Sequence, residues 1–192
     1  MSDRTKNESI TEVLPQTLAD FIEENCKSIK QTIIGFPEPN LRLKKPSVSV
    51  YIPRLDYAPS ARPYKALQGN VASNQAQVDW VVGDYEASIK LDLWAGNKEE
   101  LDDVFDEIFN CLNPTICPTG FSLVLEDYFN QCANFVYVGH DRVNNESDSK
   151  QDTWRITLDV LVACNAIRSR KEYIIGSTEV DVTVGTDVSI EN

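Results

Sequence analysis

Several residue types and motifs that catalysis and nucleic-acid binding depend on are scarce or absent in this sequence. There is one histidine, His140, so a Ser/His/Asp or Cys/His mechanism has a single possible base. Neither G-x-G-x-x-G nor G-x-x-x-x-G-K-[ST] occurs, so no dinucleotide- or triphosphate-binding motif is present. The 18 basic residues are outnumbered by 30 acidic ones, and the net charge of −12 argues against wrapping a phosphate backbone, which needs lysine and arginine. We therefore expect no enzyme and no bound cofactor.

Long apolar runs and metal or disulfide patterns are also missing. No run approaches the ~18 apolar residues of a membrane helix, and the polar start lacks the apolar core of a signal peptide, so we expect a cytoplasmic chain with no membrane partner. The acidic run at residues 102–107 lacks the glycine pattern of a calcium loop, so no metal site is expected. An enzyme using a carboxylate-bound divalent ion is the weakest alternative. Five cysteines without C-x-x-C spacing indicate reduced thiols: Cys26, Cys111, Cys117, Cys132 and Cys164.

The remaining composition is that of one globular domain. Hydrophobic residues make up 42% and charged residues 25% of 192 residues, which is enough chain for one core. We expect a flexible N-terminus over residues 1–14, a single domain over 15–170 and a C-terminal extension over 171–192. Alternation through Val180 and Val182 predicts that the extension is an edge strand or one exchanged with another subunit.

Two amphipathic helices are predicted. The first starts near Pro15, and Asn97 with Glu100 forms a capping-box pattern before the second. The outer face of the second helix is acidic, and its first turns suit the helix dipole, so a solvated face is expected. The apolar stripes are Leu18, Phe21, Ile22 and Ile29 in the first helix, and Leu101, Val104, Phe105, Ile108, Phe109 and Leu112 in the second.

Alternating residues predict strands at 47–52, 85–95, 121–125, 133–137 and 154–165, with the two short ones forming a hairpin. Within 85–95 the side that carries Asp92 is expected to face solvent, and Trp94 to cover a loop or a partner. Trp154 has the inward phase of its strand, which favours core packing. The predicted class is α+β, with a mixed, mostly antiparallel sheet flanked by two amphipathic helices.

An arm is expected at about residues 54–84. Residues 54 to about 77 are rich in proline, glycine and small polar residues, which favours a long loop over a core element. Such an arm is either a mobile surface loop or a contact with a neighbour. Tyr57 and Tyr64 stand among basic residues and are candidate interface residues, and anchoring of the loop by these tyrosines is commoner than contact with a phosphate strand. A second polar loop is expected at residues 140–152, which places His140 in a loop.

The order of these pieces resembles the tail-terminator and tail-completion proteins of long-tailed bacteriophages. The likeness rests on "LDLWAGNKEELDDVFDEI", on "GFSLVLEDYFN" and on "SDSKQDTWRITLDVLV", and covers roughly residues 15–170. In that family a strand ending in an aromatic and a small residue leads into a helix, and a Trp-Arg-x-x-Leu strand follows a polar loop. The resemblance implies a tail-terminator-like mixed sheet and no catalysis.

The resemblance also implies a role and partners. Six subunits would form a ring that caps the tail tube, halts its polymerisation and joins the head-tail connector. Loop 144–152, with Asp148 and Gln151, would lie at a ring surface, and Trp94 is a further candidate interface residue. Arg155 has the outward phase, so it would form a salt bridge within the subunit, the default, or between subunits.

The acidic balance fits a ring through which DNA passes without specific binding, since like charge prevents sticking. Asp102, Asp103 and Asp106 are candidates for the lumen or another acidic surface. Expected partners are further copies of the chain, the tail-tube protein and a sheath or connector protein, in the virion and, during assembly, in the host cytoplasm. A neck, sheath-end or baseplate adaptor of a contractile tail is the alternative, and an unrelated binding module would be a stable monomer.

Overall fold

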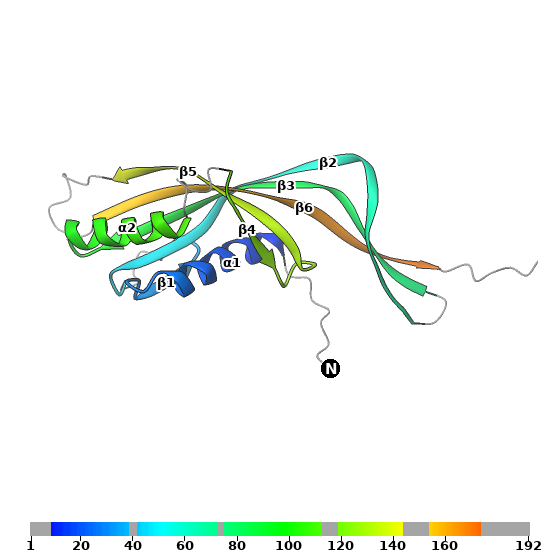
Figure 1. Ribbon diagram of the computed structural model, residues 1–192, viewed down its shortest axis with the longest axis horizontal. Coiled ribbons are helices and arrows are strands. Elements are labelled where there is room, and N and C mark those ends of the chain that lie inside the picture. Colours follow the sequence, from blue (N-terminus) through cyan, green and yellow to red (C-terminus); the bar gives the residue numbers. More distant parts are fainter. Residues whose placement is uncertain (1–8, 39–41, 73–74, 113–118, 144–153, 174–192) are drawn as a thin grey trace, which may run out of the picture.

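The computed structural model describes residues 9–38, 42–72, 75–112, 119–143 and 154–173. Over these residues the chain forms two helices and six strands (Figure 1). In chain order they are α1 (Ile10–Asn25), β1 (Gln31–Ile34), β2 (Ser47–Ala72), β3 (Gln75–Ala95), α2 (Lys98–Leu112), β4 (Phe121–Leu125), β5 (Gln131–Val143) and β6 (Trp154–Tyr173).

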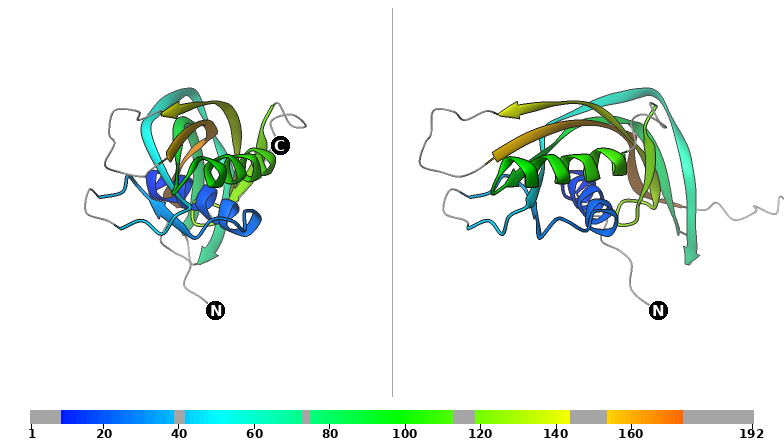
Figure 2. Two further views of the ribbon diagram at one scale, coloured as in Figure 1. Left: turned by 90° about the vertical axis from the view of Figure 1, so that its left-hand side faces the viewer. Right: turned by 60° about the vertical axis from the view of Figure 1, so that its left-hand side comes forward.

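The strands form one curled sheet in the order β1-β2-β3-β6-β5-β4. The β1–β2 pair is parallel and the other neighbours are antiparallel, so the predicted α+β class and mixed, mostly antiparallel sheet are confirmed. Figure 2 shows the strands arching over α1 and α2, which lie together on the concave face. The expectation of a sheet flanked by two helices therefore holds in the sense that both helices cover the same face.

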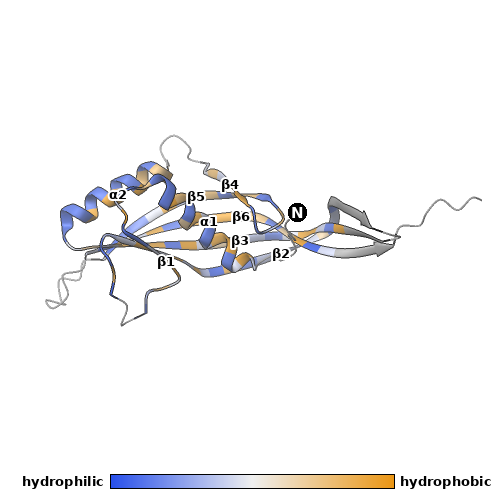
Figure 3. Cartoon of the chain, turned by 90° about the horizontal axis from the view of Figure 1, so that it is seen from below, coloured by the Kyte–Doolittle hydropathy of each residue, from blue (hydrophilic) through white to orange (hydrophobic). Residues whose placement is uncertain are grey.

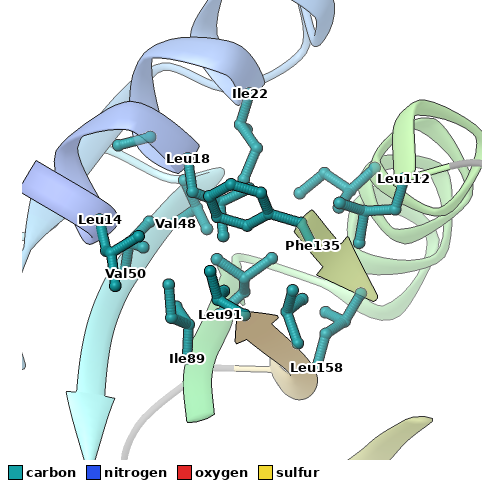
Figure 4. Close-up of a cluster of buried hydrophobic side chains, with 14 of the residues drawn as sticks. Leu14, Leu18, Ile22, Val48, Val50, Ile89, Leu91, Leu112, Phe135 and Leu158 are labelled. Atoms are coloured by element: carbon teal, nitrogen blue, oxygen red, sulfur yellow. The ribbon is translucent and has the colours of Figure 1, made fainter. Parts of the chain in front are cut away.

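The core lies between this concave face and the two helices. Phe135 of β5 projects toward α1, and Leu112 reaches the same cluster from α2 (Figure 4). Hydropathy alternates along the strands and differs between the two sides of each helix, as Figure 3 shows. This pattern buries one apolar face per element. Fully buried members of the core are Leu14, Leu18, Ile22, Val48, Val50, Ile89, Leu91, Leu93, Ile108, Phe135, Ile156 and Leu158.

Helix α1 begins five residues before the predicted start at Pro15, so the boundary of a flexible N-terminus at residue 14 is wrong. Ile10, Val13 and Leu14 are buried and extend the apolar stripe toward the N-terminus. Pro15 lies inside the helix, where it removes one backbone hydrogen bond and its ring crowds the carbonyl one turn before it. Burial of three further apolar side chains outweighs that loss.

Helix α2 matches its prediction. The Asn97 side chain accepts a hydrogen bond from the Glu100 amide at 2.8 Å, and the Glu100 carboxylate accepts one from the Gly96 amide at 2.7 Å. In a standard capping box the carboxylate accepts the backbone amide of the N-cap residue itself. Here the Glu100 carboxylate accepts the amide of Gly96, the residue before the Asn97 cap, and satisfies a free amide in the same way. The predicted inner stripe is buried, apart from half-buried Phe109.

The stretch predicted as a long loop is instead a β-hairpin. Strand β2 continues beyond Pro53 and pairs with β3 from Ser47↔Trp94 to Ala72↔Gln75. Its prolines are tolerated because the register shifts after Tyr51 and because, among the described residues, no strand lies on the other side of β2 beyond the four residues paired with β1. We call residues 54–72 and 75–84, together with 165–173 of β6, the arm; its outer part extends beyond both helices (Figure 1).

Strand β6 spans 20 residues rather than about twelve, and runs the length of the arm beside β3. The Gln131 side chain bonds both backbone groups of Asn165, at 2.7 and 3.2 Å, and the Tyr128 hydroxyl accepts the Ile167 amide. These side chains take the place of β5, whose pairing with β6 ends at Ala163. Trp154, expected in the core, is 42% exposed, so that prediction is wrong.

Candidate interaction surfaces

A buried ionic cluster lies on the face of the sheet opposite the helices. Leu91 and Leu93 point into the core, so Asp92 between them points outward, yet its side chain is fully buried. The Arg155 Nη2 atom donates to Asp92 Oδ2 at 2.6 Å, and the Thr157 hydroxyl donates to Oδ1 at 2.5 Å. The β3–β6 register places Asp92 directly opposite Thr157. The prediction that this side of residues 85–95 faces solvent is therefore wrong at Asp92.

Aromatic rings cover the cluster. Gly35, with φ of 95°, turns the chain after β1, and Phe36 then packs against Tyr51 and Trp94 at 5.6 and 6.5 Å between ring centroids. The Arg155 guanidinium lies 4.8 Å from the Trp94 ring and 5.7 Å from that of Phe36, within cation–π range. Burial raises the pKa of Tyr51, and the nearby Asp92 charge raises it further.

Two predicted interface residues are therefore used inside the subunit. Arg155 forms its ion pair with Asp92 of the same chain, which is the within-subunit alternative. Trp94 covers the guanidinium and donates from Nε1 to the Ser49 hydroxyl at 3.3 Å. The burial of Asp92 and the role of Phe36 were missed, because neither follows from strand alternation. The only signal in the sequence is a carboxylate and an arginine on strands that pair.

A second ion pair lies farther along the same face. The Lys90 ammonium donates to Asp159 at 2.8 Å, and both side chains are about one-third exposed, at 33% and 32%. The hydrogen bond to Asp159 raises the pKa of Lys90. This pair is more hydrated than the one that buries Asp92, so it contributes less to the fold.

The acidic face of α2 is partly occupied by contacts within the subunit. Asp102 lies 2.9 Å from the Arg142 guanidinium of β5. Asp103 and Asp106 are exposed. A role for these three carboxylates in a lumen stays a prediction.

Glu107 of α2 holds the chain where it leaves α1. Its two carboxylate oxygens accept the backbone amides of Lys27 and Ser28 at 2.8 and 3.1 Å. Burial acts to raise the pKa of Glu107, but the hydrogen bonds from the Ser28 hydroxyl and from the two amides outweigh it, so the pKa is lowered.

The four described cysteines are free thiols. Cys26, at the end of α1, meets Cys111 of α2; a hydrogen bond between the two thiols and then burial raise the pKa of Cys26. Burial also raises the pKa of Cys164 to about 11. Cys26 and Cys164 are therefore protonated near neutral pH and pack as small apolar groups.

The arm presents its tyrosines on the surface. Tyr57 is 46% exposed, its hydroxyl donates to the Val82 carbonyl at 3.1 Å, and its ring packs against Tyr85. Tyr64 is 56% exposed and lies opposite Val81 in the ladder. Tyr57 is thus anchored to the arm itself, while both rings keep a surface open to a partner. The other candidate interface residues, Asp148, Gln151, Val180 and Val182, lie outside the described residues.

The single histidine packs against aromatic rings. His140 lies in β5 rather than in a loop, its ring centroid is 4.6 Å from that of Phe105, and its Nδ1 is 2.6 Å from the Tyr137 hydroxyl. Across the described part of the chain, no three His, Cys, Asp or Glu side chains are grouped so as to hold a metal ion. Among the same residues, no helix is long and apolar enough to cross a membrane.

Comparison with known proteins gives similarity to solved structures only. No family model and no curated protein matches this chain. Thirty-five chains of solved structures match it, and one of them is the sheath/tube terminator, in the extended state, of an extracellular contractile injection system (PVC). The two share 13% sequence identity at a TM-score of 0.48. The match covers 96% of this chain and 66% of the other, so this chain spans just under two thirds of that protein's length.

Proposed function

We propose that this protein is a structural component of a phage-type tail, namely the terminator that caps the tail tube. Copies of the chain form a ring, six-membered in this proposal, that stops tube polymerisation and joins the tail to the head-tail connector. The observation that carries the proposal is the arm. A three-stranded extension that projects beyond the helices, with exposed tyrosines, suits contact between subunits better than it suits a monomer.

The packing of the sequence segments behind the resemblance also supports the proposal. The strand of "LDLWAGNKEELDDVFDEI" pairs with that of "SDSKQDTWRITLDVLV", and Trp94 lies directly opposite Arg155. The two segments thus form one unit, in which the Asp92 pair fixes the end of the sheet next to α2. A ring subunit needs such a rigid body, because closure into a ring fixes the angle between neighbours.

In this proposal, the net negative charge of the chain explains how DNA passes through the ring. With a net charge of −12, a lumen wall formed by this chain would repel a duplex and let it slide. Asp103 and Asp106 are exposed and are the residues we assign to that wall, with Asp102 beside them. Tail-tube and sheath or connector proteins are the proposed partners, in the virion and, during assembly, in the host cytoplasm.

The test combines the mass of the assembly with tube length. The purified protein is measured by light scattering alone and after addition of tail-tube protein, and tubes are imaged by electron microscopy. A ring in solution, or one that forms at tube ends and limits tube length, is the expected result. A protein that leaves tube length unchanged and binds no tube end would contradict a terminator. Binding to sheath or connector protein instead would then favour the neck or sheath-end role.

A further inference from the structure

The concave face of the arm carries a basic and aromatic row. In the ladder, Lys65 of β2 and Arg168 of β6 both lie opposite Trp80 of β3, so the three side chains share one face. Alternation along β6 from Cys164 and Ala166, both buried, puts Arg168 on the concave side. The Lys65 ammonium lies 5.4 Å from the centre of the Trp80 ring. Arg168 is exposed, and its guanidinium has no ion pair among the described residues.

An acidic groove lies in the body of the subunit, between α1 and the β4–β5 turn. Its volume is about 330 Å³. Phe21 and Leu123 give it an apolar floor, and Val124, 50% exposed, forms one side. Four exposed carboxylates surround it, and no basic residue lines it in the described chain: Asp20, Glu24, Glu126 and Asp127.

The row and the groove are complementary in chemistry. Four carboxylates around one groove repel one another, and a cation placed among them relieves that repulsion. An arginine suits such a site because its planar guanidinium binds carboxylates in pairs while its methylene stem packs on apolar surface. The arm supplies such side chains at Arg168 and at Arg62, which is also exposed.

We propose that the arm of one subunit binds in the acidic groove of a second copy of this chain, with Arg168 and Arg62 between the carboxylates. The two surfaces are different patches of one chain, so the contact is head-to-tail. Repetition of such a contact closes into a ring when its rotation allows. The inference rests on the proposed ring in that it names the contact between neighbours, but it does not depend on binding to a tube.

The experiment uses two charge-reversal variants of the full chain. The arm variant is Arg62→Glu with Arg168→Glu, and the groove variant is Asp20→Lys with Asp127→Lys. Matched controls reverse exposed charges elsewhere: Arg42→Glu with Lys44→Glu, and Glu38→Lys with Asp141→Lys. Urea denaturation of each variant checks that the fold is kept, and light scattering gives the mass.

We expect the wild type and both controls to assemble and each variant to be monomeric. In an equimolar mixture of the two variants, a wild-type arm can meet a wild-type groove and a reversed arm can meet a reversed groove, so both contacts are again between opposite charges and assembly should be restored. Carbodiimide treatment of the wild type should join Lys65 to a groove carboxylate of another copy, as identified by mass spectrometry. Raising the salt to about 0.5 M should weaken assembly, because exposed charge pairs are screened.

Assembly of either variant alone at wild-type mass would overturn the contact. A mixture of the two variants that stays monomeric would overturn it as well. So would a wild type that neither assembles nor gives the cross-link. Failure here is distinguishable from failure of the terminator role. If the arm variant still forms rings that cap tubes, only the arm-groove contact is rejected. If assembly depends on the arm but the assemblies do not bind tubes, only the terminator role is rejected.

Discussion

At the scale of single residues, Asp92 depends on Arg155 because its carboxylate is removed from water. A buried carboxylate is stable as an ion only when charge and hydrogen bonds replace its hydration. Arg155 and the Thr157 hydroxyl supply both, and the Phe36 and Trp94 rings lie within cation–π distance of the arginine. The pair therefore couples β3 to β6 near α2, where the sheet meets its second helix.

Arg155→Met should lower the free energy of unfolding by about 3–5 kcal/mol, because it leaves Asp92 buried without its cation. The matched control is Lys90→Met, which removes a cation from the more exposed pair with Asp159 and should cost less than about 1 kcal/mol. Urea denaturation at neutral pH measures both. Equal losses of unfolding free energy in the two variants would show that the burial of Asp92 does not make its ion pair more important than the exposed one.

Phe105→Ala tests the inner face of α2. The ring is 9% exposed, contacts Phe109 and lies 4.6 Å from the His140 ring between centroids. Removing it should cost about 3–5 kcal/mol in chemical denaturation, since transfer and cavity terms add. Asn110→Ala, on the exposed side of the same helix, is the control and should change stability by no more than about 0.5 kcal/mol. A loss below about 1 kcal/mol for Phe105→Ala would refute its core placement.

At the scale of elements, the connection between α1 and β1 depends on α2. The amides of Lys27 and Ser28 follow the last turn of α1, and Glu107 accepts both of them. One carboxylate thus joins the two helices that lie on the concave face. The acidic outer face of α2, expected only to be solvated, includes this structural contact.

The contribution of Glu107 should depend on pH. Its pKa in the folded protein is lowered, so the stabilisation is complete above the ordinary glutamate pKa of about 4.3 and is lost as pH falls through the lower folded value. At pH 7, Glu107→Gln should cost about 0.5–1.5 kcal/mol. The difference from wild type should shrink in urea titrations below about pH 4. Asp106→Asn, one residue away and exposed, is the control; an equal, pH-independent loss in both variants would argue against the clamp.

At the scale of the whole molecule, the arm leaves strand edges open to other chains. Beyond Ile167, no described strand pairs with the outer edge of β6. Such an edge accepts an added strand, and edges of this kind are covered or protected in stable proteins. The alternating C-terminal extension remains the proposed source of that strand.

Deletion of the residues after Ser177 should leave the unfolding transition unchanged but reduce the assembled mass in light scattering, if the extension pairs with a neighbour. A variant with serine in place of Val180 and Val182, at full length, controls for the loss of chain. Rings of unchanged mass after the deletion would reject strand addition, while a lowered unfolding midpoint would show that the extension belongs to its own subunit's fold.

Elements with a local pattern of apolar residues could be predicted from the amino-acid sequence alone. The 3.6-residue stripe and cap of α2, the alternation of residues 85–95 and the hairpin of β4 and β5 are readable because each buries one regular apolar face. Tertiary structure decided the rest. Residues 54–72 form a strand despite their prolines because β3 supplies a ladder for them, and Asp92 is paired where it is buried because Arg155 and Thr157, far away in sequence, bind its carboxylate. Both depend on contacts between distant segments, which no local pattern records.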